Sequence, residues 1–129
     1  MLLDLLDHLE WYLKLHPLLQ RVIDILDRSL PYEMGIGIYQ QDGLEYEIQK
    51  YVTSTSGQLC EPKGTELHVV LEGEELFSLQ RQGEPVVVSP LTTGMFLLLQ
   101  KHEHYRHQQT LGEGLAVKKV IFRLSEPVS

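Results

Sequence analysis

Residues 64–75, "GTELHVVLEGEE", have the pattern of a β-strand followed by a turn at Gly73. Successive side chains of a strand point to opposite faces. Glu66 and His68 therefore share one face with Val70, while the other face is entirely apolar and consists of Leu67, Val69 and Leu71. A carboxylate beside an imidazole on so apolar a strand indicates either a hydrogen-bonded polar pair in a cavity or a pair of metal ligands.

Short β-rich runs separated by Gly, Pro, Asp and Ser extend in both directions from this strand, between Pro31 and the C-terminus. Asp42-Gly43 lies between two of them and is a strong hairpin signal. The later runs are "EPVVVSP" (84–90), "GMFLLLQKHEHYRHQQ" (94–109, one long strand or a strand and a turn) and "LAVKKVIFRL" (115–124). We predict a mainly β fold, a sandwich or barrel from about Gly35 to Leu124.

The N-terminal part has helical rather than strand periodicity. Leucines at helical spacing predict an amphipathic helix from about Leu3 to Leu15. A second helix is predicted to begin near Pro17 and to end at Leu30-Pro31. This helical flank, about residues 2–30, is expected to pack outside the β-structure, and residues 1–129 are expected to form a single domain.

Composition limits the function classes. The formal net charge of −7 argues against binding to a phosphate backbone, so a nucleic-acid partner is not expected. The single cysteine, Cys60, cannot form an intramolecular disulfide, which favours a reducing compartment. Asp4, Asp7 and Glu10 interrupt the leucine-rich N-terminus, so neither a signal peptide nor a membrane span is expected. We therefore predict a cytoplasmic protein with no membrane partner.

The run "HEHYRH" (102–107) supplies candidate metal ligands. If the strand continues, Gln100, His102, His104 and Arg106 share one face, whereas His107 is expected to be solvated. With Glu66 and His68 on a facing strand, His102 and His104 would complete a mixed nitrogen and oxygen set that suits zinc, manganese or iron. Solvated or purely structural histidines are the alternative.

The last strand has one apolar and one mixed face. Val120, Phe122 and Leu124 share a face, which we expect to line the barrel interior, and Lys118 has the same parity. The opposite face, with Lys119, Ile121 and Arg123, is expected to be solvated. A β-bulge would reverse this assignment.

Several sequence blocks together resemble the YhcH/YjgK/YiaL family, which includes the beta subunit of evolved beta-galactosidase. They are "LHPLLQRVIDIL", "YVTSTSG", "ELHVVLEGEE", "TGMFLLLQKHEHYRH" and "AVKKVIFRL", in an order that covers nearly the whole chain. The chain departs from the family at Glu61, where a histidine is usual, at Tyr105, which precedes Arg106 in place of a histidine, and in a short stretch before "TGMF".

The resemblance implies a cupin-like double-stranded β-helix, or jelly-roll barrel, whose polar cavity often holds a divalent metal. It also implies a role in carbohydrate catabolism as a sugar anomerase or isomerase that acts on a free sugar in the cavity, either sialic-acid-like or galactoside-derived. Glu66 would then be the base and His68 or His102 the acid, while Glu61, Tyr105, Arg106 and Lys118 would contact the sugar.

Two further expectations concern partners. The apolar face formed by Leu67, Val69 and Leu71 needs cover from the helices or from a second subunit, and we predict a homodimer. The alternative to an enzyme is a non-catalytic sugar-binding protein or an accessory subunit of a glycosidase such as beta-galactosidase.

Overall fold

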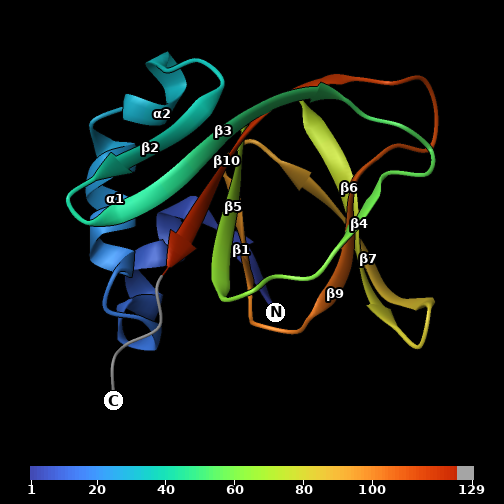
Figure 1. Ribbon diagram of the computed structural model, residues 1–129, viewed down its shortest axis with the longest axis horizontal. Helices are drawn as coiled ribbons and strands as arrows, with labels where there is room; N and C mark the ends of the chain where they lie inside the picture. The colour runs from blue at the N-terminus through green and yellow to red at the C-terminus, as the bar shows by residue number, and fades with distance from the viewer. Residues whose placement is uncertain (125–129) are drawn as a thin grey trace.

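The computed structural model describes residues 1–124, which form two antiparallel sheets that face each other, with helices on one side (Figure 1). The larger sheet has the order β1-β8-β5-β10-β3-β2, that is Leu2–Leu5, Met95–Leu99, Thr65–Glu72, Ala116–Leu124, Leu44–Val52 and Gly37–Gln41. The smaller sheet has the order β4-β9-β6-β7, that is Gln58–Cys60, His104–Gln109, Glu74–Arg81 and Glu84–Thr92. The strands thus form two separately hydrogen-bonded sheets.

The predicted hairpin is confirmed. β2 and β3 pair in register from Gly37↔Ile48 to Gln41↔Leu44. Between them, Asp42 has φ 54° and Gly43 has φ 79°. Two consecutive residues with positive φ form the tight turn whose twist matches that of paired strands, which explains the Asp-Gly sequence.

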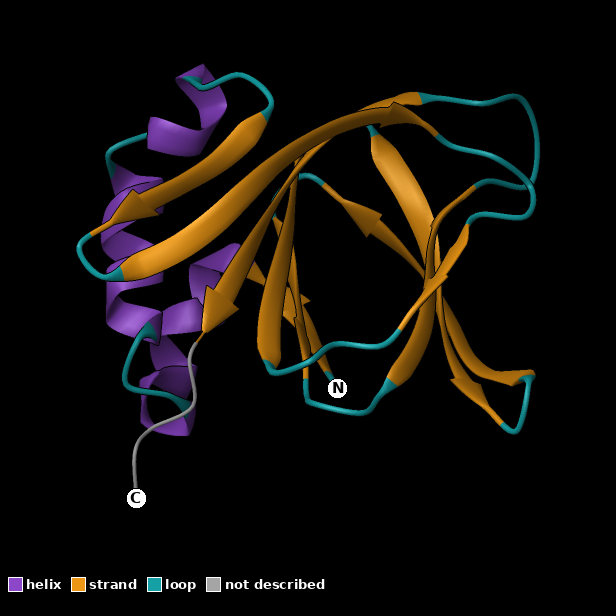
Figure 2. Cartoon of the chain, in the orientation of Figure 1, coloured by secondary structure: helices purple, strands orange, loops and turns teal. Residues whose placement is uncertain are grey.

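The central strands of the larger sheet, β5, β8 and β10, are mostly buried on both faces, and their apolar residues alternate between two cores. On β5, Leu67 and Val69 belong to a core that includes Val22 and Ile25 of the helices. Val70 belongs instead to the core between the two sheets, together with Phe77 of β6. Figure 2 shows the helices gathered on the outer side of the larger sheet.

The helices cover the face from which we predicted a homodimer. Leu67, Val69 and Leu71 are at most 6% exposed and pack in the core that the helices share. This face therefore gives no reason to expect a second subunit, and the homodimer remains a prediction.

The N-terminal prediction needs correction. The predicted first helix is a strand, β1, followed by a 3₁₀ helix, η1 (Leu6–Leu15). Residues 2–5 pair with the edge of β8, where Leu2 packs in the helix-side core and Leu3 in the inter-sheet core. Pairing with a free sheet edge outweighs the helical spacing of the leucines.

The second predicted helix is observed as α1 (Leu19–Asp27) but ends earlier, at Asp27, and Leu30-Pro31, which we expected to end it, begins a further short helix. α1 buries Leu19, Val22 and Ile25 on one face. A short α2 (Leu30–Glu33) follows, with Pro31 in its first turn, where a missing N–H is tolerated. Within residues 1–124, the structure contains no helix long and apolar enough to span a membrane.

Candidate functional site

A cavity of about 640 Å³ opens beside the inner face of the larger sheet. Its lining comes from β3, β4, β5, β9, β10 and the 61–64 loop, and comprises Glu45, Gln49, Gln58, Cys60, Glu61, Lys63, Gly64, Thr65, Glu66, Tyr105, His107, Ile121, Arg123 and Leu124. Glu61 and Lys63 are exposed and lie where the cavity meets solvent. The volume is in the usual range for sites that bind small molecules.

Glu66 is the carboxylate most deeply embedded in this wall. The Tyr105 hydroxyl donates to Glu66 Oε1 over 3.3 Å, and His68 Nε2 lies 3.1 Å from the same oxygen. Burial raises the pKa of Glu66, and the nearby Arg123 charge and the Tyr105 hydrogen bond only partly oppose that rise. Glu66 can therefore change its protonation state closer to neutral pH than an exposed glutamate can.

His68 stands behind Glu66 and does not line the cavity. Its side chain is fully buried, and burial, with the Lys119 charge, holds the pKa of His68 well below its usual range. The neutral ring donates Nε2–H to Glu66, and its buried Nδ1 has no hydrogen-bond partner in the described part of the chain. His68 thus orients Glu66, whereas the predicted role as an acid requires an imidazolium that this site disfavours.

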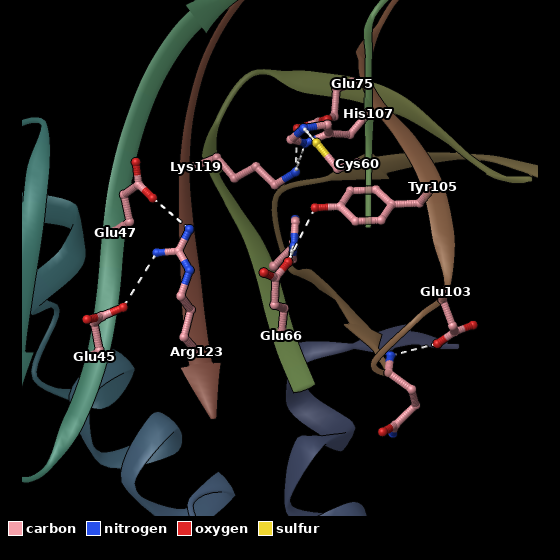
Figure 3. Close-up of polar contacts among 12 residues, drawn as sticks. Glu45, Glu47, Cys60, Glu66, Glu75, Glu103, Tyr105, His107, Lys119 and Arg123 are labelled. Carbon is pink, nitrogen blue, oxygen red and sulfur yellow. Dashed lines mark hydrogen bonds and ion pairs between the residues drawn. The ribbon is translucent and has the colours of Figure 1, made fainter. Parts of the chain in front are cut away.

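A buried charged network adjoins the cavity (Figure 3). Lys119 Nζ lies 3.2 Å from Glu75 Oε1, and both side chains are fully buried. The same ammonium donates to His107 Nδ1 over 3.1 Å, so His107 Nε2–H points to Cys60 Sγ at 3.4 Å. Burial lowers the pKa of His107 to about 2 and raises the pKa of the Cys60 thiol, so both are neutral near pH 7.

The structure separates the four predicted metal ligands. His102 Nδ1 lies 3.0 Å from Glu61 Oε1, and His104 Nε2 lies 3.5 Å from Glu61 Oε2. These two imidazoles are 72% and 58% exposed, whereas His68 is fully buried beside Glu66. The prediction of one cavity shared by all four residues, with His102 as an acid beside Glu66, is therefore corrected.

The turn after β8 explains the error. β8 ends at Leu99, and His102, with φ 70°, lies in the turn that leads to β9 in the other sheet. Because β9 begins only at His104, its inward positions are Tyr105 and His107, the reverse of the predicted parity. His107, which we expected to be solvated, is 3% exposed.

Of the four residues predicted to contact the sugar, two line the cavity and two do not. Glu61 and Tyr105 line the cavity. Arg106 instead donates to the Ser56 carbonyl over 2.7 Å. Lys118 lies on the helix side and donates to the Tyr32 carbonyl over 2.9 Å.

The two faces of β10 are thus the reverse of our prediction. Val120, Phe122 and Leu124 pack in the helix-side core, and Lys119, Ile121 and Arg123 face inwards. Our prediction assumed that the more apolar face of the last strand lies inside, but here that face meets the helices, and the inward face carries Lys119 and Arg123.

The residues present do not fit a divalent metal. Among residues 1–124, no group of three or more His, Cys, Asp or Glu side chains is arranged to hold one. Glu66 and His68 hydrogen-bond each other, and the exposed histidines are occupied by Glu61. We therefore derive no chemical step through a metal.

Sequence reasoning missed the wall that β3 contributes. Leu44, Tyr46 and Ile48 are buried on the helix side, so Glu45 and Gln49, both in the cavity lining, project from the other face. The alternation "LEYEIQKY" (44–51) contained this signal. It was overlooked because a strand with one polar face is usually solvated on that face.

Comparison with known proteins identifies the fold. The hydroxypropylphosphonic acid epoxidase from S. wedmorenis superposes with a TM-score of 0.55 at 20% identity, over 63% of this chain and 43% of the epoxidase. FeII HppE gives 0.59 at 18% identity, over 73% and 57%, and protein NMB1881 from Neisseria meningitidis gives 0.52 at 16% identity, over 78% and 96%. The chain has a cupin-like fold.

The likeness extends no further than the fold at these identities. This chain spans only about half the length of the epoxidase chains, and HppE itself has been crystallised with Fe(II) and with Co(II). No known protein family and no curated protein matches the sequence.

Proposed function

We propose that the cavity binds a free monosaccharide and that Glu66 exchanges protons with it, so that the protein acts as a sugar anomerase or isomerase in carbohydrate catabolism. The observation that carries the proposal is the Glu66 carboxyl group. It lines a cavity of suitable size, burial raises its pKa, and one of its oxygens is held by Tyr105 and His68. The resemblance of the sequence blocks to the YhcH/YjgK/YiaL family favours a sugar as the ligand.

Anomerisation needs a group that can take and return a proton. As a carboxylate, Glu66 accepts the proton of the anomeric hydroxyl while the ring C–O bond breaks and the carbonyl forms. As a carboxylic acid, it returns that proton to the former ring oxygen, which gives the open-chain hydroxy-carbonyl form. After rotation about the C1–C2 bond, Glu66 takes the proton of the same hydroxyl as its oxygen attacks the other face of the carbonyl, and gives the proton to the carbonyl oxygen, which yields the second anomer. A carboxyl group with a raised pKa suits both half-reactions near neutral pH.

Neighbouring residues assist without reacting. Tyr105 stays a protonated phenol because burial and the Glu66 charge raise its pKa, so it remains a hydrogen-bond donor to Glu66. Both contacts from Tyr105 and His68 use Oε1, and neither uses Oε2. They fix the orientation of the carboxyl group.

The test is anomeric exchange, measured by NMR for a panel of free aldoses and ketoses. The wild type is expected to accelerate exchange of at least one sugar. Glu66→Gln should lose about a hundredfold or more of that acceleration, the usual contribution of a general acid–base group. Glu84→Gln, which removes an exposed carboxylate from β7, is the matched control and should keep the wild-type rate. Treatment with EDTA should leave the rate unchanged.

A non-catalytic role is the second candidate. Glu61, which stands where the resembled family has a histidine, is engaged by two histidines at the cavity mouth, so the site has fewer free reacting groups than the family pattern implies. Sugar binding without faster exchange, with a large glycosidase co-purifying, would favour an accessory subunit. A panel in which no sugar binds would contradict both candidates.

A further inference from the structure

Arg123 is the most deeply placed cation of the cavity wall, and two carboxylates already hold it. Its Nη2 lies 2.8 Å from Glu47 Oε1 and its Nη1 lies 3.8 Å from Glu45 Oε2. Both glutamates come from β3, which pairs with β10 in the register Arg123↔Glu45 (Figure 3). The guanidinium charge is thus matched within the protein and is not free to bind an anion.

The remaining charges of the lining do not create an excess of positive charge. The ionisable acids are Glu45, Glu61 and Glu66, and the cations are Lys63 and Arg123. The number of cations in the lining equals the number of carboxylates if Glu66 is protonated, and is smaller by one if Glu66 is ionised. Lys119, the other interior cation, is paired with Glu75 and does not line the cavity.

The wall also offers a hydrogen-bond acceptor that needs a donor. Gln49 lines the cavity, and its buried Oε1 has no hydrogen-bond partner within residues 1–124. A buried acceptor without a donor is costly, and a sugar hydroxyl would satisfy it.

We infer that this site selects neutral sugars over sugar acids, with Glu45 and Glu47 as specificity-determining residues that act by neutralising Arg123. The inference rests on the proposed sugar site and narrows its substrate class. Between the two classes that the family resemblance suggests, it favours a galactoside-derived neutral sugar over a sialic-acid-like one.

The test compares hexoses with their uronates, in which a carboxylate replaces the hydroxymethyl group at C6. Glucose, galactose and mannose are paired with glucuronate, galacturonate and mannuronate, and their affinities for the wild type are measured by NMR titration at low ionic strength. The neutral member of the best-binding pair is expected to bind at least about fivefold more tightly, as for one weakly screened charge contact. A uronate that binds as tightly as its neutral partner, or more tightly, would overturn the inference and leave the sugar site standing. If none of the six sugars binds, both proposals fail.

Glu47→Gln tests the role of Arg123. The change keeps the shape and a hydrogen-bonding amide but removes the nearer of the two carboxylates that neutralise Arg123, so uronate affinity should rise about fivefold while neutral-sugar affinity changes little. Glu84→Gln removes the same charge outside the cavity and should change neither affinity. An unchanged uronate affinity in folded Glu47→Gln would refute the assignment of Glu47. Should that variant fail to fold, the wild-type comparison still decides the selectivity.

Discussion

Lys119 is a fully buried charge in a chain of modest size. Burial lowers the pKa of its ammonium group, and the Glu75 carboxylate opposes that shift. Glu75 also accepts hydrogen bonds from the Tyr51 hydroxyl and from the backbone N–H of Gln108, whose nitrogen is 2.7 Å away. Removal of the lysine would therefore leave a buried carboxylate with hydrogen bonds but no counter-charge.

We expect Lys119→Met to lower the free energy of unfolding by about 3–5 kcal/mol, because breaking one side of a buried ion pair leaves the other charge uncompensated. Lys118→Met is the matched control. It removes one hydrogen bond to the Tyr32 carbonyl and should cost about 1 kcal/mol or less. Urea denaturation of both variants measures the difference. A larger loss for Lys118→Met would mean that the two faces of β10 are assigned wrongly.

At the scale of residues, sequence reasoning placed Glu66 on the inner face of β5 but misplaced the lysines. Strand parity correctly grouped Lys118 with Val120 and Phe122, and it separated Lys119 from them. Parity alone cannot say which group faces the cavity when helices cover the outer face. That choice depends on what packs against each face, which is a property of the tertiary structure.

At the scale of elements, strand alternation and turn residues predicted the hairpin and the turn at Gly73 correctly, but they did not predict where the chain leaves one sheet for the other. The β2–β3 hairpin and the β5–β6 turn at Gly73 were both expected and are both observed. The segment 94–109, predicted as one long strand or a strand and a turn, instead forms β8 in one sheet and β9 in the other. The chain turns between them, where the backbone N–H of His102 donates to the Pro62 carbonyl. After Gly94, which opens the segment, no proline or glycine signals the break.

The turn at Gly73 provides a test of how closely β5, β6 and β10 are packed. Gly73 has φ 83° and Gly83, in the β6–β7 turn, has φ 80°, so an alanine at either position meets similar backbone strain, about 1–2 kcal/mol. A β-carbon at Gly73 would also collide with the Ala116 carbonyl, whereas one at Gly83 meets open space.

Gly73→Ala is therefore expected to lower the unfolding free energy by roughly 1–3 kcal/mol more than Gly83→Ala does, the usual cost of inserting an atom into a filled space. Thermal and urea unfolding of the two variants give the comparison. Equal losses would show that the start of β10 can move away from this turn.

At the scale of the whole molecule, the residues of the helix-side core and the residues that line the cavity lie on opposite sides of the larger sheet. Ile25 of α1 is completely buried in that core. The mainly β class and the helical flank were predictable from periodicity. The choice of cover was not, because the leucine spacing does not show whether the helices or a second subunit would cover Leu67, Val69 and Leu71.

Ile25→Ala should lower the unfolding free energy by about 2–5 kcal/mol, since it leaves a cavity in a filled core. At a temperature where the variant remains folded, its affinity for the sugar that the wild type binds should be unchanged. Denaturant titration and NMR titration of the same sample measure both quantities. Weakened binding in the folded variant would show that the helices help to shape the cavity.

The alternation along β3 has a consequence for how such a protein can diversify. Glu45, Glu47 and Gln49 face inwards, while Leu44, Tyr46 and Ile48 between them anchor the helix-side core. Every second codon of this segment can thus mutate under selection for a new ligand while its neighbours stay constrained by folding. Single-residue insertions are barred, since one would exchange the two sets and ruin both roles. We expect related chains to vary at 45, 47 and 49, to conserve apolar side chains at 44, 46 and 48, and to tolerate length changes in the turns alone.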